Sequence, residues 1–416
     1  MFRRSRTAWL PFSWLVLAAS SAWAQPTTLK QAFDAAWLRQ PEAQSREARQ
    51  QAAAARRQVA DSWTAEPAAL ELSLKSDRLN KNEGSREIEA GLAIPLWLPG
   101  ERARTRALAD AELRVAASRV LAAQLRTAAS VRESYWLWQR ARIELDLARE
   151  RLGNAQALAG DVVRRVKAGD LARADQHQAD GAAATAEAGL AEAVGTLAGA
   201  SHQLRALTGI PPGPNAVPVL DAGAVPEPVP GVPDFAAMDT GHPAVAELLD
   251  RAEVARRATE LARVQTRGNP ELTLATTRDR GMSGEPYQQS MTLGVRIPFG
   301  SDSRNRAKLA TAQADGIEAQ AQLDLERQRL LSELDAARLR LASARTQLIA
   351  ADKSSQLARE SRGFFQKSFR MGETDLPTRL RIEIEAIAAE RQAARTRIDL
   401  AAAVSALRQT LGLLPE

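Results

Sequence analysis

Three histidines, His177, His202 and His242, are the side chains of this chain best suited to bind a metal or to transfer protons near neutral pH. They are scattered, with no metal-ligand or catalytic spacing between them. The chain has no cysteine, no phosphate-binding P-loop and no G-x-S-x-G nucleophile motif. We therefore expect solvated or packing histidines in a protein that is not an enzyme and has no cofactor or metal site.

The composition excludes a second class of function. Charged residues make up 25% of the 416 residues, and both signs are mixed along the chain. Nucleic-acid binding requires a concentrated basic face, and the sequence has none. Aromatic residues are only 4% and alanine is abundant, which favours long helices over a thick globular core.

Residues 1–24 have the pattern of a cleaved export signal. Arg3, Arg4 and Arg6 precede an apolar stretch, and Ala22-Trp23-Ala24 has the small-x-small form of a cleavage site. A single membrane anchor is the alternative, but the apolar stretch is shorter than the roughly 20 residues that a span needs. The exported chain has no cysteine for a disulfide or a thioether-linked lipid. No later stretch is apolar enough for a helical span, so membrane insertion would require a barrel.

The chain contains two repeats at an offset of 203 positions. The recurring landmarks are Gly91, Ile94 and Pro95 with Gly294, Ile297 and Pro298, Gly169 with Gly372, and Leu204-Arg205 with Leu407-Arg408. We divide the chain into a first repeat over 25–210, a Pro-rich linker over 211–235 and a second repeat over 236–416. The linker is expected to be an extended connector.

Each repeat is predicted to contain a helix, two strands, a very long helix, a break and a final helix. The first helices open at Gln40-Pro41 and His242-Pro243 and are expected to end near Thr64 and Thr266. The long helices follow Pro99-Gly100 and Gly300-Ser301 and end near Lys167 and Arg370, a length of about 68 residues or ~100 Å. Leu334, Leu341 and Leu348, with Leu330, Ala337 and Ala344, form a heptad seam.

Period-two alternation marks two strand pairs of about 11–13 residues per strand, each strand with one apolar and one polar face. A soluble sheet on a core is one interpretation. The other is a membrane-facing surface, with the outward residues Leu70, Leu72, Leu74, Leu92, Leu274, Leu293 and Val295. Four strands cannot close a barrel, and open edges cannot lie in lipid. Three copies would supply twelve strands, enough for a barrel with an open lumen above a hollow cylinder of helices.

The duplication, the G-x-x-I-P turn into each long helix and the glycine-centred breaks resemble the TolC family of outer-membrane efflux proteins. The breaks are Gly169-Asp170-Leu171 with Asp175, and Gly372-Glu373 with Leu376, and they look most like the CzcC-type heavy-metal branch. The resemblance implies a mainly α fold with a small β part and a trimeric outer-membrane barrel. It also implies a homotrimer in outer-membrane lipid, with a long periplasmic part.

In that family the breaks are periplasmic tips that meet a periplasmic adaptor, or membrane fusion protein, which joins the duct to an inner-membrane resistance–nodulation–division pump. We therefore expect Leu171 and Leu376 to be exposed apolar anchors, with Asp170 and Glu373 as rim charges. Acidic rings narrow the entrance in the family, but Thr378 and Arg381 stand at those positions here. Asp375, with Thr378 and Arg381, is a candidate entrance lining, and Glu373 or Glu383 could also supply the charge.

The resemblance implies a passive duct that exports heavy-metal cations. The same duct could serve drug export or type I protein secretion, because the pump selects the cargo. A periplasmic coiled-coil adaptor is the alternative from another class. An adaptor normally has one helical hairpin flanked by β-rich domains, whereas this sequence has two helical hairpins and isolated strand pairs.

Overall fold

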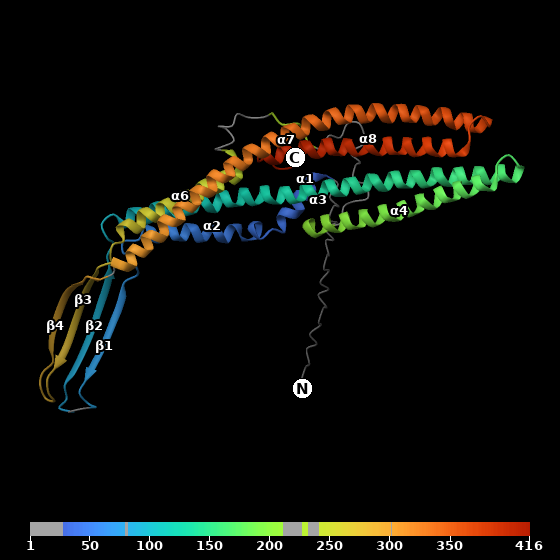
Figure 1. Ribbon diagram of the computed structural model, residues 1–416. Helices are drawn as coiled ribbons and strands as arrows, with labels where there is room; N and C mark the ends of the chain where they lie inside the picture. The colour runs from blue at the N-terminus through green and yellow to red at the C-terminus, as the bar shows by residue number, and fades with distance from the viewer. Residues whose placement is uncertain (1–27, 80–81, 211–226, 232–240, 301) are drawn as a thin grey trace, which may run out of the picture.

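The computed structural model of the protein describes residues 28–79, 82–210, 227–231, 241–300 and 302–416. These residues form an elongated rod of helices with a four-stranded sheet extending at an angle from one end (Figure 1). The predicted mainly helical fold with a small β part is confirmed. The expected signal at 1–24 and most of the linker lie outside the described residues.

The predicted order of elements occurs twice. The first half contains α1 (Leu29–Leu38), α2 (Pro41–Ala60), β1 (Ala69–Ser76), β2 (Arg86–Pro95), α3 (Glu101–Ala168) and α4 (Arg173–Thr208). The second half contains α6 (Pro243–Val264), β3 (Glu271–Arg280), β4 (Gln288–Arg296), α7 (Asp302–Met371) and α8 (Leu376–Thr410). None of the helices in these described parts is both long and apolar enough to cross a membrane.

Three details differ from the sequence prediction. Helix α1 was not predicted, although Thr28 and Gln31 form a capping box at its start. Helices α2 and α6 end at Ala60 and Val264, a few residues before the predicted ends. The strands contain 8, 10, 10 and 9 residues and are therefore shorter than predicted.

The long helices have the predicted length and seam. Helix α3 has 68 residues and α7 has 70. On α7, five of the six predicted seam residues are buried, and the sixth, Leu348, is half-buried. A larger core forms where α1, α3, α4 and α8 meet, around Phe33, Tyr135, Trp136 and Ile398.

The helices lie side by side in a fixed order. Near the sheet, α3 packs against α2 and α6, and α6 packs against α7. Towards the far end, α3 packs against α4 and α8, and α8 packs against α7. Helices α2 and α4 therefore occupy one edge of the rod, and α7 occupies the other.

The four strands form one antiparallel sheet in the order β1-β2-β3-β4. The expectation of isolated strand pairs is wrong, because β2 of the first hairpin also pairs with β3 of the second, for example Leu92 with Leu274. The sheet has the same edge order as the rod. Strand β1, which follows α2, lies at one edge, and β4, which precedes α7, lies at the other.

Candidate functional site: the helical tip and the exposed sheet face

Both long helices end in the same hydrogen-bonded turn at the far end of the rod. Gly169 and Gly372 have left-handed backbones, with φ of 87° and 78°. In the first turn, the backbone N–H of Gly169 donates to the carbonyl of Val166 (3.1 Å) and that of Asp170 to the carbonyl of Arg165 (2.9 Å). In the second turn, the N–H of Gly372 donates to the carbonyl of Phe369 (3.2 Å) and that of Glu373 to the carbonyl of Ser368 (3.0 Å). This is a Schellman motif, in which glycine accepts the left-handed conformation without a Cβ clash. A Cβ at either glycine would meet no atom within 4 Å, so both turns are open to a partner.

The helices that return from the tip begin with different caps. In α4, a carboxylate oxygen of Asp175 accepts a hydrogen bond from the N–H of Ala172 at 3.0 Å. In α8, Asp375 is the N-cap residue, but its side chain makes no capping hydrogen bond. Asp375 is exposed and free to meet solvent or a partner, whereas Asp175 is half-buried and holds the turn together.

The expected role of the two tip leucines needs correction. Leu376 is only 1% exposed and packs with Leu158, Val162 and Phe369 in a small core under the tip. Leu171 is half-buried and packs against the same cluster. Neither is a fully exposed anchor, because both pack into the apolar cluster that the α3/α4 and α7/α8 hairpins share. The exposed side chains at the turns include those of Asp170, Glu373 and Met371.

The candidate entrance residues lie in the first turns of α8. Asp375 and Arg381 are exposed and Thr378 is half-buried. Arg381 lies 3.5 Å from Glu385 one turn further along. Glu383 is half-buried beside Arg362, at 3.6 Å, so its charge is already paired within the chain. Asp375 and Glu373 are exposed, and neither forms an ion pair with a described residue.

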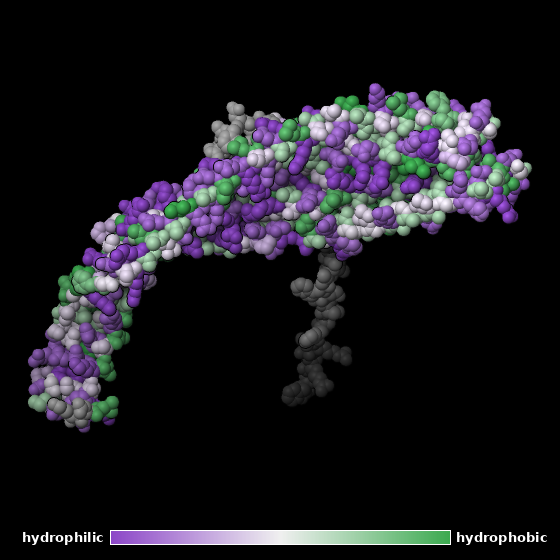
Figure 2. Space-filling model, in the orientation of Figure 1, coloured by the Kyte–Doolittle hydropathy of each residue, from purple (hydrophilic) through white to green (hydrophobic). Residues whose placement is uncertain are grey.

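The strand register brings the candidate membrane-facing residues onto one face of the sheet. Leu70 pairs with Leu92, Leu92 with Leu274 and Leu274 with Leu293. Paired residues of antiparallel strands point to the same side. The seven candidate residues are between 38% and 74% exposed. Figure 2 shows hydrophobic residues along the sheet and hydrophilic residues over the middle of the rod.

The opposite face of the sheet is polar. Glu71, Ser73 and Lys75 alternate with the leucines of β1, and Lys75 forms an ion pair with Glu87 of β2 at 3.2 Å. Thr273 and Thr277 continue this face on β3. The sheet is therefore amphipathic across all four strands, and none of the described residues covers its apolar face with a core.

The histidines do not converge. His177 and His202 are exposed on α4. His242 is buried at the start of α6, where its Nδ1 accepts a hydrogen bond from the N–H of Ala244 at 3.3 Å. Burial lowers the pKa of His242. No group of three or more metal-binding side chains occurs in the part of the chain that the structure describes.

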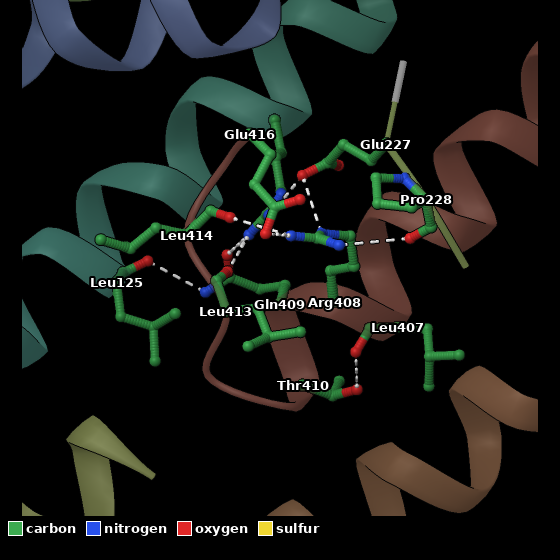
Figure 3. A network of polar contacts seen from close by, with 11 residues as sticks. Leu125, Glu227, Pro228, Leu407, Arg408, Gln409, Thr410, Leu413, Leu414 and Glu416 are labelled. Carbon is green, nitrogen blue, oxygen red and sulfur yellow. Dashed lines mark hydrogen bonds and ion pairs between the residues drawn. The ribbon is translucent and has the colours of Figure 1, made fainter. Parts of the chain in front are cut away.

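A buried ionic cluster joins the linker to both repeats, and sequence reasoning missed it. Glu227 of the linker lies 2.7 Å from Arg132 of α3. It also lies 3.3 Å from Arg408 of α8 (Figure 3). Arg408 also lies 2.8 Å from Glu416, and its Nη1 donates to the carbonyl of Pro228 at 3.2 Å. The described piece of the linker is thus fixed against the rod rather than extended away from it. Arg408 belongs to the landmark Leu407-Arg408, which recurs between the repeats, and this recurrence was the sequence signal that could have pointed to the cluster.

Known proteins resemble one part of this chain in sequence and nearly all of it in fold. Residues 33–210 match a protein family described as "Outer membrane efflux protein". No curated protein sequence matches the chain.

Several solved structures share the fold over nearly the whole chain. CusC, in a structural study of its folding and transmembrane channel formation, has a TM-score of 0.75 at 17% identity, covering 93% of this chain and 92% of that one. The CmeC outer membrane channel of Campylobacter jejuni has a TM-score of 0.72 at 14% identity, covering 94% and 86%. The outer membrane protein VceC of Vibrio cholerae has a TM-score of 0.72 at 18% identity, covering 93% and 97%.

Proposed function

We propose that the protein is the outer-membrane channel of a tripartite efflux system, a passive exit duct assembled from three copies of the chain. The observation that carries the proposal is the four-stranded sheet whose exposed face is apolar from β1 to β4. An uncovered apolar face of this extent calls for a lipid or protein partner. The family match of residues 33–210 and the outer-membrane neighbours in fold support lipid.

The edges of the sheet and of the rod indicate how neighbouring copies of the chain would join. The sheet has free edges at β1 and β4, and the rod has free edges at α2/α4 and at α7. If β4 of one copy pairs with β1 of the next, the same rotation brings α7 against the neighbour's α2 and α4. The contact is head-to-tail, and such contacts close into a ring when the rotation permits. A closed ring leaves no strand edge in lipid.

The surface of α7 supports this contact. Six large apolar residues of α7 are between 56% and 73% exposed: Ile317, Leu325, Leu339, Ile349, Leu357 and Phe364. At about 100° per residue they fall within an arc of about 120°, opposite the buried seam. A helix with apolar residues on two opposite faces requires a second helical neighbour, which the next copy would supply.

Three copies agree best with the size of the sheet. Three sheets give twelve strands, and barrels of that size have an open lumen. The polar face of Glu71, Ser73 and Lys75 would then line the lumen, and the leucine face would contact lipid. The helical rods would form a tunnel below the membrane, with the tips of α3/α4 and α7/α8 in the periplasm.

The tips are the proposed docking site for a periplasmic adaptor that connects the duct to an inner-membrane resistance–nodulation–division pump. Two bare glycine turns with exposed Asp170 and Glu373 favour close approach of a partner helix. Heavy-metal cations are the proposed cargo, supported by the resemblance of the tip motifs to the CzcC-type branch. Drug export and type I secretion are the competing assignments for the same duct.

The test is assembly and complementation of the full-length protein. We expect a homotrimer that is extracted from the outer-membrane fraction only with detergent. A detergent-free monodisperse monomer would contradict the proposal and would fit a periplasmic adaptor instead. In a strain that lacks the gene, increased sensitivity to divalent metal salts would support metal export, whereas sensitivity to drugs alone would assign the duct to a drug pump.

A further inference from the structure

A cavity of about 710 Å³ lies between the two helical hairpins just inside the tip. Its walls come from the last turns of α3 and α7, the first turns of α8, and α4. The volume is within the range of about 300–1,000 Å³ that is usual for small-molecule sites in proteins.

The cavity has an excess of positive charge. Six arginines line it: Arg151, Arg164, Arg165, Arg362, Arg370 and Arg379. The lining acids are Glu150, Asp161 and Glu383. Asp161 pairs with Arg164 at 3.2 Å and with Arg165 at 3.6 Å, and Glu383 pairs with Arg362 at 3.6 Å. Within the described residues, no carboxylate forms an ion pair with Arg151, Arg370 or Arg379.

Two of the lining arginines stack on Phe369. The guanidinium carbons of Arg165 and Arg379 lie 4.8 and 4.7 Å from the centre of this buried ring. Arg165 is fixed further, because it donates hydrogen bonds to the carbonyl oxygens of Phe369 at 3.0 Å and Arg370 at 3.1 Å. These contacts hold the cations of Arg165 on α3 and Arg379 on α8 close together at the tip end of the cavity, which the exposed Arg370 of α7 also lines.

Arg379 is the least satisfied of these cations. It is half-buried, and no hydrogen bond from its guanidinium to any described residue is present. Burial lowers the pKa of Arg379; the nearby acids Glu383 and Asp161 oppose this shift, and Arg370 and Arg165 add to it. A guanidinium with no hydrogen-bond partner in the chain can bind carboxylate or phosphate oxygens in pairs.

The remaining wall of the cavity is apolar. Leu380, Ile384 and Ile387 lie on one side of α8 at helical spacing and extend away from Arg379 towards the middle of the rod. Leu158 of α3 joins them. The cavity therefore combines a cationic end with an apolar wall.

We propose that this cavity binds an amphiphilic organic anion, with a carboxylate or phosphate at Arg370 and Arg379 and an apolar body against Leu380, Ile384 and Ile387. The anion would join α7 to α8 and place a negative charge between Arg370 and Arg379.

The probe is 1-naphthyl phosphate, titrated calorimetrically into the full-length protein in zwitterionic lipid nanodiscs. We expect saturable binding at one site per chain, and at least tenfold weaker binding of inorganic phosphate, which lacks the apolar body. Arg379→Gln and Arg370→Gln should each weaken binding of the probe at least tenfold. Arg379→Lys, which keeps the charge, should retain part of the affinity. Arg173→Gln is the matched control, because Arg173 is an exposed arginine at the start of α4 that does not line the cavity.

The outcomes separate clearly. Unchanged oligomer size and circular dichroism of the Arg379→Gln protein would show that it folds, so its loss of binding would support the site. No saturable binding to the wild-type protein, or equal binding by Arg379→Gln and Arg173→Gln, would overturn the proposal. Equal affinity for inorganic phosphate and the naphthyl ester would overturn the amphiphilic class of ligand.

Discussion

The carboxylate of Glu227 accepts a hydrogen bond from Arg132 at 2.7 Å, and both side chains are at least 95% buried. Arg132 lies in the middle of α3, and Glu227 belongs to the segment between the two repeats. Since Arg408 of α8 contacts the same carboxylate oxygen, one acid connects the linker to a helix of each repeat. The linker thus contributes directly to the packing of the rod.

Glu227→Ala should destabilise the protein by about 3–5 kcal/mol, because it leaves two buried arginines without their shared acid. Burial already lowers the pKa of Arg132, so this site solvates an unpaired cation poorly. Urea unfolding in detergent measures the effect. Glu416→Ala is the control, since Glu416 also contacts Arg408 but is 64% exposed, and its loss should cost less than about 1 kcal/mol. Equal effects of the two substitutions would contradict the argument.

His242 should make stability fall in mild acid. Burial lowers its folded-state pKa below the value of about 6.5 expected in the unfolded chain. The unfolded chain therefore binds more protons as the pH falls below that value, and the stability contributed by neutral His242 is lost. His242→Asn keeps an N-capping side chain without a titrating group. Melting temperatures between pH 7.5 and 5 should fall less for this variant than for the wild type, and parallel curves would contradict the prediction.

Local signals in the sequence predicted the rod well. A helix that ends at a glycine depends only on the backbone conformation of that glycine and not on distant contacts. The ends of α3 and α7 near Gly169 and Gly372 could therefore be located from the sequence. The alternation of the strands likewise assigned Leu70 and Leu293 to one face before their pairing was known. Helix α1 could also have been found, since Thr28 and Gln31 have the spacing of a capping box.

Features that depend on contacts between distant segments were missed. Leu376 was expected to be an exposed anchor because the family resemblance implies adaptor docking at the tip, but Phe369 and Val162, from other helices, cover it. The pairing of β2 with β3 joins strands from different repeats, and neither strand contains a signal for it. Glu227 was an unremarkable acid among prolines, because its burial depends on Arg132 and Arg408.

Leu293→Arg should impair insertion and trimer assembly if the apolar sheet face contacts lipid. Arginine on a lipid-facing strand costs about 2–4 kcal/mol near the membrane midplane. Thr292→Arg is the matched control, because Thr292 is exposed on the next position and on the opposite face of β4. Heat-modifiable trimer bands on gels would report assembly. If Thr292→Arg impairs trimer assembly and Leu293→Arg does not, the lipid-facing side of the sheet is the opposite of the one proposed.

Leu339→Glu combined with Ile349→Glu should weaken association between copies while each chain stays folded. Both residues are more than 70% exposed on α7 in the single chain, so the substitutions remove no internal packing. They would place two charges in the proposed contact with α2 and α4 of the next copy, where unpaired charge is costly. Gln347→Glu is the control, since Gln347 is exposed on α7 but lies outside the apolar arc. Mass measurement in detergent should give monomers for the double variant and trimers for the control; trimers from both would exclude this face as the contact.

Substitutions at the tip should separate folding from docking. Leu376→Ala should lower the free energy of unfolding by about 2–5 kcal/mol, because it opens a cavity in the core beneath the turn. Gly169→Ala should cost about 1–2 kcal/mol, since its φ of 87° is strained for a residue with a Cβ. Leu171→Asp would alter both properties, because Leu171 packs against that core and also lies at the turn.

Asp170→Lys isolates the docking role. Asp170 is exposed just beyond the end of α3, and a cation near a helix C-terminus is favourable, so stability and trimer assembly should not fall. The reversed charge at the rim should nevertheless reduce efflux-dependent resistance and cross-linking to the adaptor. Asp180→Lys, an equal charge reversal at an exposed position within α4, should keep both activities. If Asp170→Lys assembles and supports resistance as well as Asp180→Lys does, the rim charge has no part in docking, and contact with the adaptor must depend on the bare glycine turns or on another surface of the rod.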